Sequence, residues 1–164
     1  MRVRMLGALA AFVLLADLSC SDNDTTGITV TQRFTATLSG ANVRPTPITT
    51  TATGSAQFTW VSDIRTLFYE VDVVGIDSVT LAHIHGPADT GTSAGVVLNL
   101  YTTGKSKGLA FTGVLASGVG GQLGAPAGMT MDSLLVLMQN GHAYVNVHTV
   151  AHPAGEIRGQ VVKQ

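Results

Sequence analysis

The segment AHIHGPA, residues 82–88, combines a strand pattern with a pair of histidines. Successive side chains of a β-strand point to opposite faces, so His83 and His85 share one face and Ile84 points to the other. The dipeptide Gly86-Pro87 then ends the strand in a turn. Ile84 can therefore enter a hydrophobic core while the two imidazoles stay close enough to share one metal ion. Two histidines make only half a site, because zinc and copper need at least three protein ligands.

The residues just before this pair pose a problem of alternation. Val79 and Leu81 have the same parity as His83 and His85, so an unbroken strand would place all four on one face. Either a β-bulge near Leu81 resets the alternation, or Val79 and Leu81 cover a minor apolar patch. We favour the bulge.

The same two-residue alternation recurs in both directions along the chain, which is rich in Gly and poor in charge. Short alternating runs separated by Gly, Pro, Asp and Ser clusters predict strands joined by turns. The predicted strands are residues 28–38, 52–60, 67–73, 79–85, 96–101, 109–115, 143–149 and 155–161. A single helix is predicted at 130–141, where Thr130 can cap the first turn and Gly141 ends the last. Without strand–helix alternation, this pattern favours an all-β fold: an antiparallel Greek-key β-sandwich or flattened barrel of about seven or eight strands with one short helix.

The glycine-rich segment 117–128 matches no nucleotide-binding motif. It has neither the dinucleotide spacing nor the Lys-Ser/Thr ending of a phosphate-binding loop, and no strand-to-helix context surrounds it. We predict a surface loop. A hydrolase is also disfavoured, because the Gly-x-Ser-x-Gly motif is absent and the only cysteine, Cys20, lies near the N-terminus.

The last predicted hairpin supplies a third histidine. If Thr149 and Gly155 close it, its outward residues pair across the two strands as Tyr144 with Gln160, Asn146 with Arg158, and His148 with Glu156. Cross-strand neighbours lie about 5 Å apart at Cβ, so Glu156 could accept a hydrogen bond from the His148 ring. A carboxylate that fixes a ligand's tautomer in this way is a common partner of metal-bound histidine.

These residues allow two interpretations. In the first, His83, His85 and His148 bind copper or zinc, His152 is a candidate fourth ligand, and Glu156, Asn146 and Arg158 surround the ligands. In the second, the histidines form a hydrogen-bonded polar cluster that shapes the fold, and Glu156 and Arg158 form a surface ion pair. Imidazole binds metal only when neutral, so its ordinary pKa predicts that affinity falls through about pH 6.5.

The N-terminal residues are typical of an export signal. Arg2 and Arg4 precede an apolar run over 5–16 that is too short to span a bilayer, and Cys20 follows. We predict a signal peptide at 1–19, lipidated Cys20 as the mature N-terminus, a polar tether over 20–28 and a β domain over 29–164. The lipoprotein pattern prefers an aliphatic residue where Asp17 stands, so ordinary signal cleavage is the alternative.

Charge and cysteine content bound the function further. Removing residues 1–19 takes away two arginines and one aspartate and leaves a formal charge of −2. No basic patch is present, which argues against nucleic-acid binding. With Cys20 alone, the chain forms no internal disulfide. We expect an extracytoplasmic protein, held at a membrane by its lipid if Cys20 is lipidated and secreted otherwise.

Four segments together resemble the CHRD domain, a family named for chordin and widespread in secreted bacterial proteins. They are FTATLSGANVRP at 34–45, TATGSAQF at 51–58, AHIHGPADTGTSAGVV at 82–97 and AYVNVHTVAHPAGEIRGQV at 143–161. The resemblance covers about 31–162 and implies an all-β fold and an extracellular setting, but no established reaction. Where the family often has Asn-Glu-Val-Pro-Pro, this chain has Asn42-Val43-Arg44-Pro45, so the resemblance gives that loop no role.

The chain is also loosely similar to copper–zinc superoxide dismutase, a Greek-key β protein whose copper ligands include a His-x-His pair on a strand. The cysteine pair and zinc loop of that family are missing. Two functions follow as hypotheses. The first is a cell-surface binding or structural module with a histidine metal site and an unidentified extracellular partner. The second is a copper- or zinc-dependent redox metalloprotein.

Overall fold

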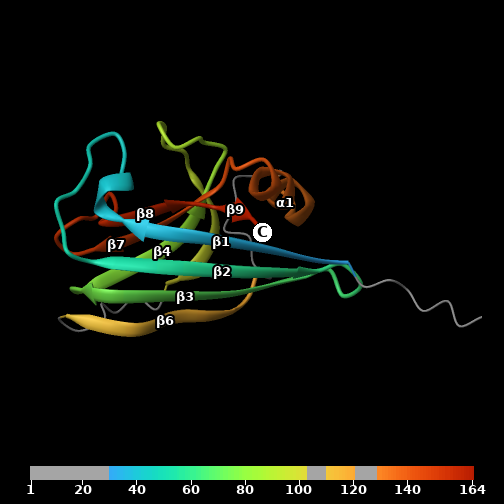
Figure 1. Cartoon of the computed structure of the whole chain (residues 1–164), viewed down its shortest axis with the longest axis horizontal. Helices are drawn as coiled ribbons and strands as arrows, with labels where there is room; N and C mark the ends of the chain where they lie inside the picture. The colour runs from blue at the N-terminus through green and yellow to red at the C-terminus, as the bar shows by residue number, and fades with distance from the viewer. Residues whose placement is uncertain (1–29, 103–109, 121–128) are drawn as a thin grey trace, which may run out of the picture.

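The computed structural model describes residues 30–102, 110–120 and 129–164 (Figure 1). The predicted signal peptide, Cys20 and the tether lie outside these residues. One antiparallel sheet of nine strands contains almost all of the regular structure. Its strands are β1 Thr31–Ser39, β2 Thr53–Val61, β3 Thr66–Ile76, β4 Val79–His85, β5 Val96–Tyr101, β6 Phe111–Val119, β7 Tyr144–Thr149, β8 Ile157–Gln160 and β9 Val162–Lys163. A 3₁₀ turn, η1 Gly40–Asn42, and one helix, α1 Met131–Gln139, complete the described elements.

The sheet curves into a nearly closed barrel. Its strand order is β5-β4-β7-β8-β1-β2-β3-β6, with β9 pairing beside β1. The edge strand β5 approaches β3, the neighbour of the other edge strand β6: the Tyr69 hydroxyl on β3 donates a hydrogen bond to the Leu100 carbonyl of β5 at 3.1 Å. Strands that are distant in sequence lie side by side, as the Greek-key prediction requires. The predicted antiparallel all-β fold with one short helix is therefore confirmed.

The interior of the barrel is apolar and follows the predicted alternation. Buried residues alternate along β1 and β2 as the strand period requires, with Phe34, Ala36 and Leu38 on β1 and Ala56, Phe58 and Trp60 on β2. Trp60 is 4% exposed, and Leu134 and Met138 of the helix are completely buried in the same core. The largest aliphatic and aromatic side chains that are less than 2% exposed are Phe34, Phe58, Leu38, Leu67, Ile76, Ile84, Leu98, Leu134, Met138 and Ile157. This single core fixes which face of each strand is left for polar residues.

The predicted helix is confirmed as α1, which lies near β9 in Figure 1. Thr130 caps it, since its side chain accepts a hydrogen bond from the Ser133 amide at 3.1 Å. Leu134, Leu135 and Met138 form its buried stripe. With nine residues it is short, and no described helix has the length and apolarity that crossing a bilayer requires.

The bulge predicted near Leu81 is present. On β4 the pairing with β7 moves from Val79 opposite Thr149 to Leu81 opposite His148, so two steps on β4 match one step on β7. Val79 is therefore completely buried with the core, while Leu81 stays on the histidine face and is 37% exposed. The extra residue lets one strand place a valine in the core and still present both histidines to the opposite face.

The sixth strand differs from its prediction. It runs over Phe111–Val119, beyond the predicted end at 115, and takes up the start of the segment predicted as a loop. Gly118 pairs with Tyr69, and a Cβ on Gly118 would lie 3.3 Å from the Tyr69 hydroxyl. The glycine thus leaves room for the tyrosine ring beside it. The rest of the predicted loop, 121–128, lies outside the described residues.

The candidate metal centre

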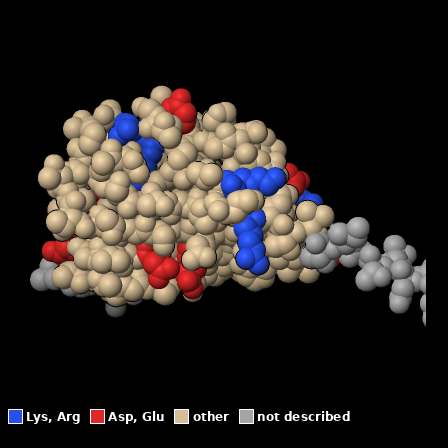
Figure 2. Space-filling model, in the orientation of Figure 1, with Lys and Arg blue, Asp and Glu red and all other residues tan. Residues whose placement is uncertain are grey.

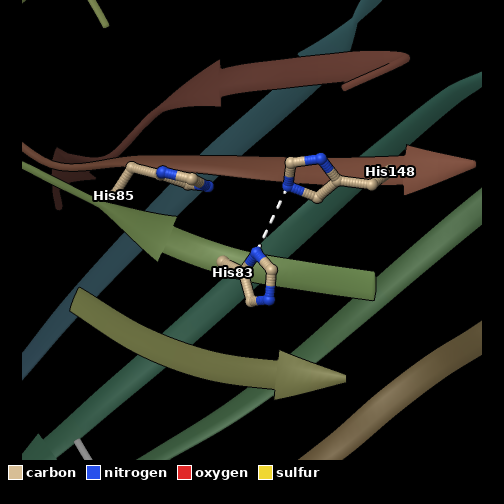
Figure 3. Close-up of side chains that lie close together, drawn as sticks. All are labelled: His83, His85 and His148. Carbon is tan, nitrogen blue, oxygen red and sulfur yellow. Dashed lines mark hydrogen bonds between the residues drawn. The ribbon is translucent and has the colours of Figure 1, made fainter. Parts of the chain in front are cut away.

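Three histidines converge from two neighbouring strands on the face of the sheet away from the core. His83 and His85 come from β4 and His148 from β7, which pairs with β4 (Figure 3). Nδ1 of His83 lies 3.2 Å from Nε2 of His148. One ring nitrogen from each histidine lies within 4.8 Å of the other two. Among the described residues, this is the one group of three or more metal-binding side chains that comes so close.

Two of the rings are oriented by backbone carbonyls. Nδ1 of His85 lies 3.0 Å from the Ala94 oxygen, and Nδ1 of His148 lies 3.0 Å from the Pro153 oxygen. A carbonyl only accepts hydrogen bonds, so each Nδ1 carries the proton and each Nε2 keeps a free lone pair. Hydrogen bonds of this kind orient metal-binding histidines in many proteins.

The third ring completes the arrangement. Because Nε2 of His148 has no proton, Nδ1 of His83 donates the hydrogen bond that joins the two rings. Nε2 of His85 is buried and has no hydrogen-bond partner among the described residues. Buried polar nitrogens are rarely left unpaired, so the lone pair of this atom is available to a metal ion or a water molecule.

The cluster is nearly inaccessible to water and contains no acid. His83 and His85 are each 7% exposed and His148 is 8% exposed. Burial, followed by the neighbouring histidines, lowers the pKa of His83 to about 4. Burial lowers the pKa of His85 to about 4 against the opposing effect of its hydrogen bond to Ala94, and burial also lowers the pKa of His148. All three rings are therefore neutral at pH 7, the form that binds metal. The pH 6.5 limit expected from an ordinary histidine is too high for these rings.

A stack of side chains supports His85, and the sequence alone did not reveal it. The Tyr144 ring lies parallel to the His85 ring, with centroids 4.9 Å apart. The Arg158 guanidinium carbon lies 3.6 Å from the Tyr144 centroid. Both groups stack over the same ring, so they must cover its opposite faces. The only signal in the sequence was that Tyr144 and Arg158 share the parity of His148 across the hairpin.

The hairpin register was predicted correctly, but one of its consequences was not. Tyr144 pairs with Gln160 and Asn146 with Arg158, as expected. Glu156, however, does not accept a hydrogen bond from His148. Its two oxygens accept from the hydroxyls of Thr50 and Thr149, each at 2.8 Å. The turn between the strands brings a backbone carbonyl over His148, so the carboxylate turns toward the two threonines.

Asn146 and Arg158, the other residues predicted to surround the ligands, form hydrogen bonds to the backbone of nearby loops. Asn146 donates to the Ala154 carbonyl at 3.1 Å and so holds the turn. Arg158 is 2% exposed and forms no ion pair with Glu156, since the described part of the chain has one salt bridge, Arg65 with Asp132. The predicted surface ion pair is therefore wrong: both side chains are buried, and each has other partners.

His152 lies in the turn after β7 and does not join the three clustered rings. Its backbone is used instead: its amide donates to the Thr149 hydroxyl, and its carbonyl accepts from Gly155. The structure thus separates a cluster of three histidines from a fourth that shapes the turn beside it.

Comparison with known proteins gives one match. The family model of the CHRD domain matches residues 34–161, which is most of the chain. This protein therefore belongs to the CHRD family, as its sequence segments indicated. No curated protein and no solved structure shows significant similarity to it.

Proposed function

We propose that this CHRD-domain protein is an extracytoplasmic binding or structural module whose barrel holds one copper or zinc ion at His83, His85 and His148. The observation that carries the proposal is the convergence of three neutral, buried imidazoles, two of which have their tautomers set by backbone carbonyls. A purely structural cluster would be expected to satisfy its own hydrogen bonds, whereas Nε2 of His85 has no partner among the described residues.

The spacing of the rings suits a small transition-metal ion. With metal–nitrogen bonds of about 2.0–2.1 Å, ligand nitrogens around a tetrahedral ion lie roughly 3.3 Å apart. The His83 and His148 nitrogens are already 3.2 Å apart. The third nitrogen lies within 4.8 Å of these two and reaches the same spacing if the rings turn slightly. His83 would bind through Nδ1 once its proton has moved to Nε2 of the same ring, and the other two would bind through Nε2.

The donor set favours copper or zinc over harder ions. Calcium and magnesium prefer oxygen ligands, and no carboxylate belongs to the cluster. Three imidazoles suit both zinc and copper, and the affinity of nitrogen ligands for divalent ions peaks at copper. Because the three rings are neutral, they can bind a cation without repulsion from a charge of their own.

A redox metalloprotein is the second candidate function. Its support is the same cluster, because copper held by three histidines can change oxidation state. Against it stands burial: rings that are 7–8% exposed leave little room for a substrate to reach the ion. We therefore favour a metal that stabilises the surface loops and a module whose contacts are made elsewhere.

The cellular setting follows from the N-terminus and the family. CHRD domains occur in extracellular or secreted proteins, and we infer that residues 1–19 direct export and that Cys20 is lipidated. The protein would then display its barrel at the surface of a membrane, tethered by 20–28, to an extracellular partner of unknown identity.

Metal analysis of the purified protein, prepared without a histidine tag, tests the proposal. We expect about one equivalent of copper or zinc per chain after dialysis against metal-free buffer. The variant with His83, His85 and His148 all replaced by alanine is the control and should hold none. Equal metal content in the two proteins would contradict the proposal.

A further inference from the structure

A second polar site lies on the other side of Tyr144 from the histidines. A pocket of about 80 Å³ opens there, lined by Asn42, Arg44, Thr90, Arg158 and Gln160. A water molecule takes up about 30 Å³ in the liquid, so the pocket holds two or three waters or one small polyatomic group. Figure 2 shows one small group of blue, basic atoms at this end of the barrel, near η1, with red, acidic atoms close by.

The guanidinium at the base of this pocket forms no ion pair with a carboxylate of the described residues. Arg158 is 2% exposed, and its Nη2 donates to the backbone oxygen of Asp89 at 2.8 Å. Its Nη1 is buried and has no hydrogen-bond partner among the described residues. The carboxylate of Asp89 is directed elsewhere, toward the Gly91 amide and the Thr92 hydroxyl. A buried charge without a counter-ion is costly, which makes Arg158 a receptor for an anion.

A second arginine reinforces the positive charge. Arg44 lines the same pocket, and its Nη1 donates to the backbone oxygens of Ala41 and Val43, both at 2.9 Å. Burial lowers the pKa of Arg158, the charge of Arg44 acts in the same direction, and Tyr144 and the nearby Asp89 act against them. Among the residues that the structure describes, no acidic side chain lines the pocket. Two guanidinium groups facing one small cavity form a typical binding site for carboxylate or phosphate.

Gln160 requires a ligand that can donate a hydrogen bond. Its Nε2 donates to the carbonyls of Ala88 and Gly141, at 2.7 and 2.6 Å, which sets the orientation of the amide. Its Oε1 is therefore identified as the oxygen, and this atom is buried without a partner among the described residues. An oxygen can only accept a hydrogen bond. The pocket thus offers an unused donor on Arg158 and an unused acceptor on Gln160.

We propose that this pocket binds a small oxyanion that also carries an O–H group, such as hydrogen phosphate or a short hydroxycarboxylate. The anionic oxygens accept from Arg158 and Arg44, and the hydroxyl donates to Gln160. The exposed side chains of Asn42 and Thr90 lie at the opening. This site shares no side chain with the histidine cluster and does not depend on a bound metal.

Anion titrations of metal-free protein test the proposal. Metal is removed by chelation, the chelator is removed by desalting, and binding is followed by calorimetry and by the melting temperature at pH 7 and constant ionic strength. We expect saturable, millimolar or tighter binding of phosphate and glycolate. Sulfate and acetate, which have no O–H group at this pH, should bind more weakly, and chloride should have no saturable effect.

Two variants and one control locate the binding. Arg44→Gln removes a half-buried charge at the rim and should weaken phosphate binding about 10-fold, the usual cost of one charged hydrogen bond. Arg158→Gln should abolish it. Arg33→Gln removes the same charge from an exposed position on β1, away from this pocket, and should bind phosphate like the wild type.

Each outcome decides the matter. Phosphate binding that Arg44→Gln weakens and Arg33→Gln does not supports the site, even if Arg158→Gln fails to fold. A phosphate response equal to that of chloride, or one that Arg44→Gln leaves unchanged, overturns it. Equal binding of glycolate and acetate would overturn the role given to Gln160. None of these results bears on metal binding, because the protein is stripped of metal throughout.

Discussion

Two buried polar clusters include residues of the β7–β8 hairpin, and they differ in how completely their hydrogen bonds are used. Each oxygen of the Glu156 carboxylate accepts one hydrogen bond, from the hydroxyls of Thr50 and Thr149, so neither oxygen is left without a partner. The histidine cluster has three neutral rings and one buried nitrogen, on His85, with no partner among the described residues. Burial alone therefore does not distinguish a site from a structural contact. The unpaired Nε2 of His85 is what sets the histidine cluster apart from the Glu156 cluster.

The largest effect should come from removing any one of the clustered histidines. His83→Ala, His85→Ala and His148→Ala should each abolish tight copper or zinc binding, because two imidazoles cannot hold the ion against water. Isothermal titration calorimetry measures the loss. His152→Ala is the matched control, and its affinity should equal that of the wild type. Tight binding that survives in any of the three cluster variants would place the ligands elsewhere.

The next effect concerns pH in the absence of metal. The lowered pKa values of His83 and His85, about 4, mean that the unfolded chain binds protons that the folded chain does not between pH 6.5 and 4. Stability should thus be fully present above pH 6.5 and fall as the pH drops toward 4, by about 1.4 kcal/mol per pKa unit for each ring before coupling is considered. Urea unfolding across this range measures it. A variant with both rings replaced by glutamine should lose most of the slope; an unchanged slope would assign it to other groups.

Replacing Glu156, unlike replacing one of the clustered histidines, should lower stability and leave metal affinity almost unchanged. Glu156→Gln replaces an acceptor of one threonine hydroxyl with a donor, which should lower the free energy of unfolding by about 1–3 kcal/mol. Metal affinity should stay within a factor of about two of wild type, since the carboxylate does not contact His148. Chemical denaturation and metal titration of the same sample separate the two readouts. A 10-fold loss of metal affinity without a loss of stability would return Glu156 to the metal site.

The smallest effect should come from Tyr144→Phe. The hydroxyl of Tyr144 bonds to the amide and the carbonyl of Ala94, the residue whose oxygen also orients His85. Phenylalanine keeps the stack on His85 but frees this loop, so stability should fall by about 1 kcal/mol. Metal should dissociate somewhat faster, because His85 is held less firmly. Stopped-flow transfer of the metal to a chelator measures that rate, and an unchanged rate would remove Tyr144 from the support of the site.

The sequence predicted the fold and the ligand strands because both depend on the two-residue period of β-strands. The same period placed His83 with His85, required the bulge near Leu81 and set the register that pairs Asn146 with Arg158. It could not predict which way a side chain turns at the end of a hairpin. Glu156 was therefore assigned to His148, whereas the carbonyl of Pro153 occupies that position.

The sequence also did not predict that the polar face of the sheet, which carries His148 and Arg158, is buried. The alternation placed His148 and Arg158 on the outward side, but loops far away in the chain cover that side and leave Arg158 only 2% exposed. The strand period predicts on which face of a sheet a side chain lies, but it does not predict whether a loop covers that face. The lowered pKa values and the stack through Tyr144 both follow from this cover.

The melting temperature of the wild-type protein with and without added zinc or copper at pH 7 tests the central claim most directly. A ligand at 1,000 times its dissociation constant stabilises the folded state by about 4 kcal/mol, which corresponds to a rise of roughly 10 °C for a domain of this size. The account predicts this rise for the wild type and for His152→Ala, and no rise for His83→Ala. A wild-type melting temperature that metal leaves unchanged would contradict the metal site and leave the three histidines as a structural cluster.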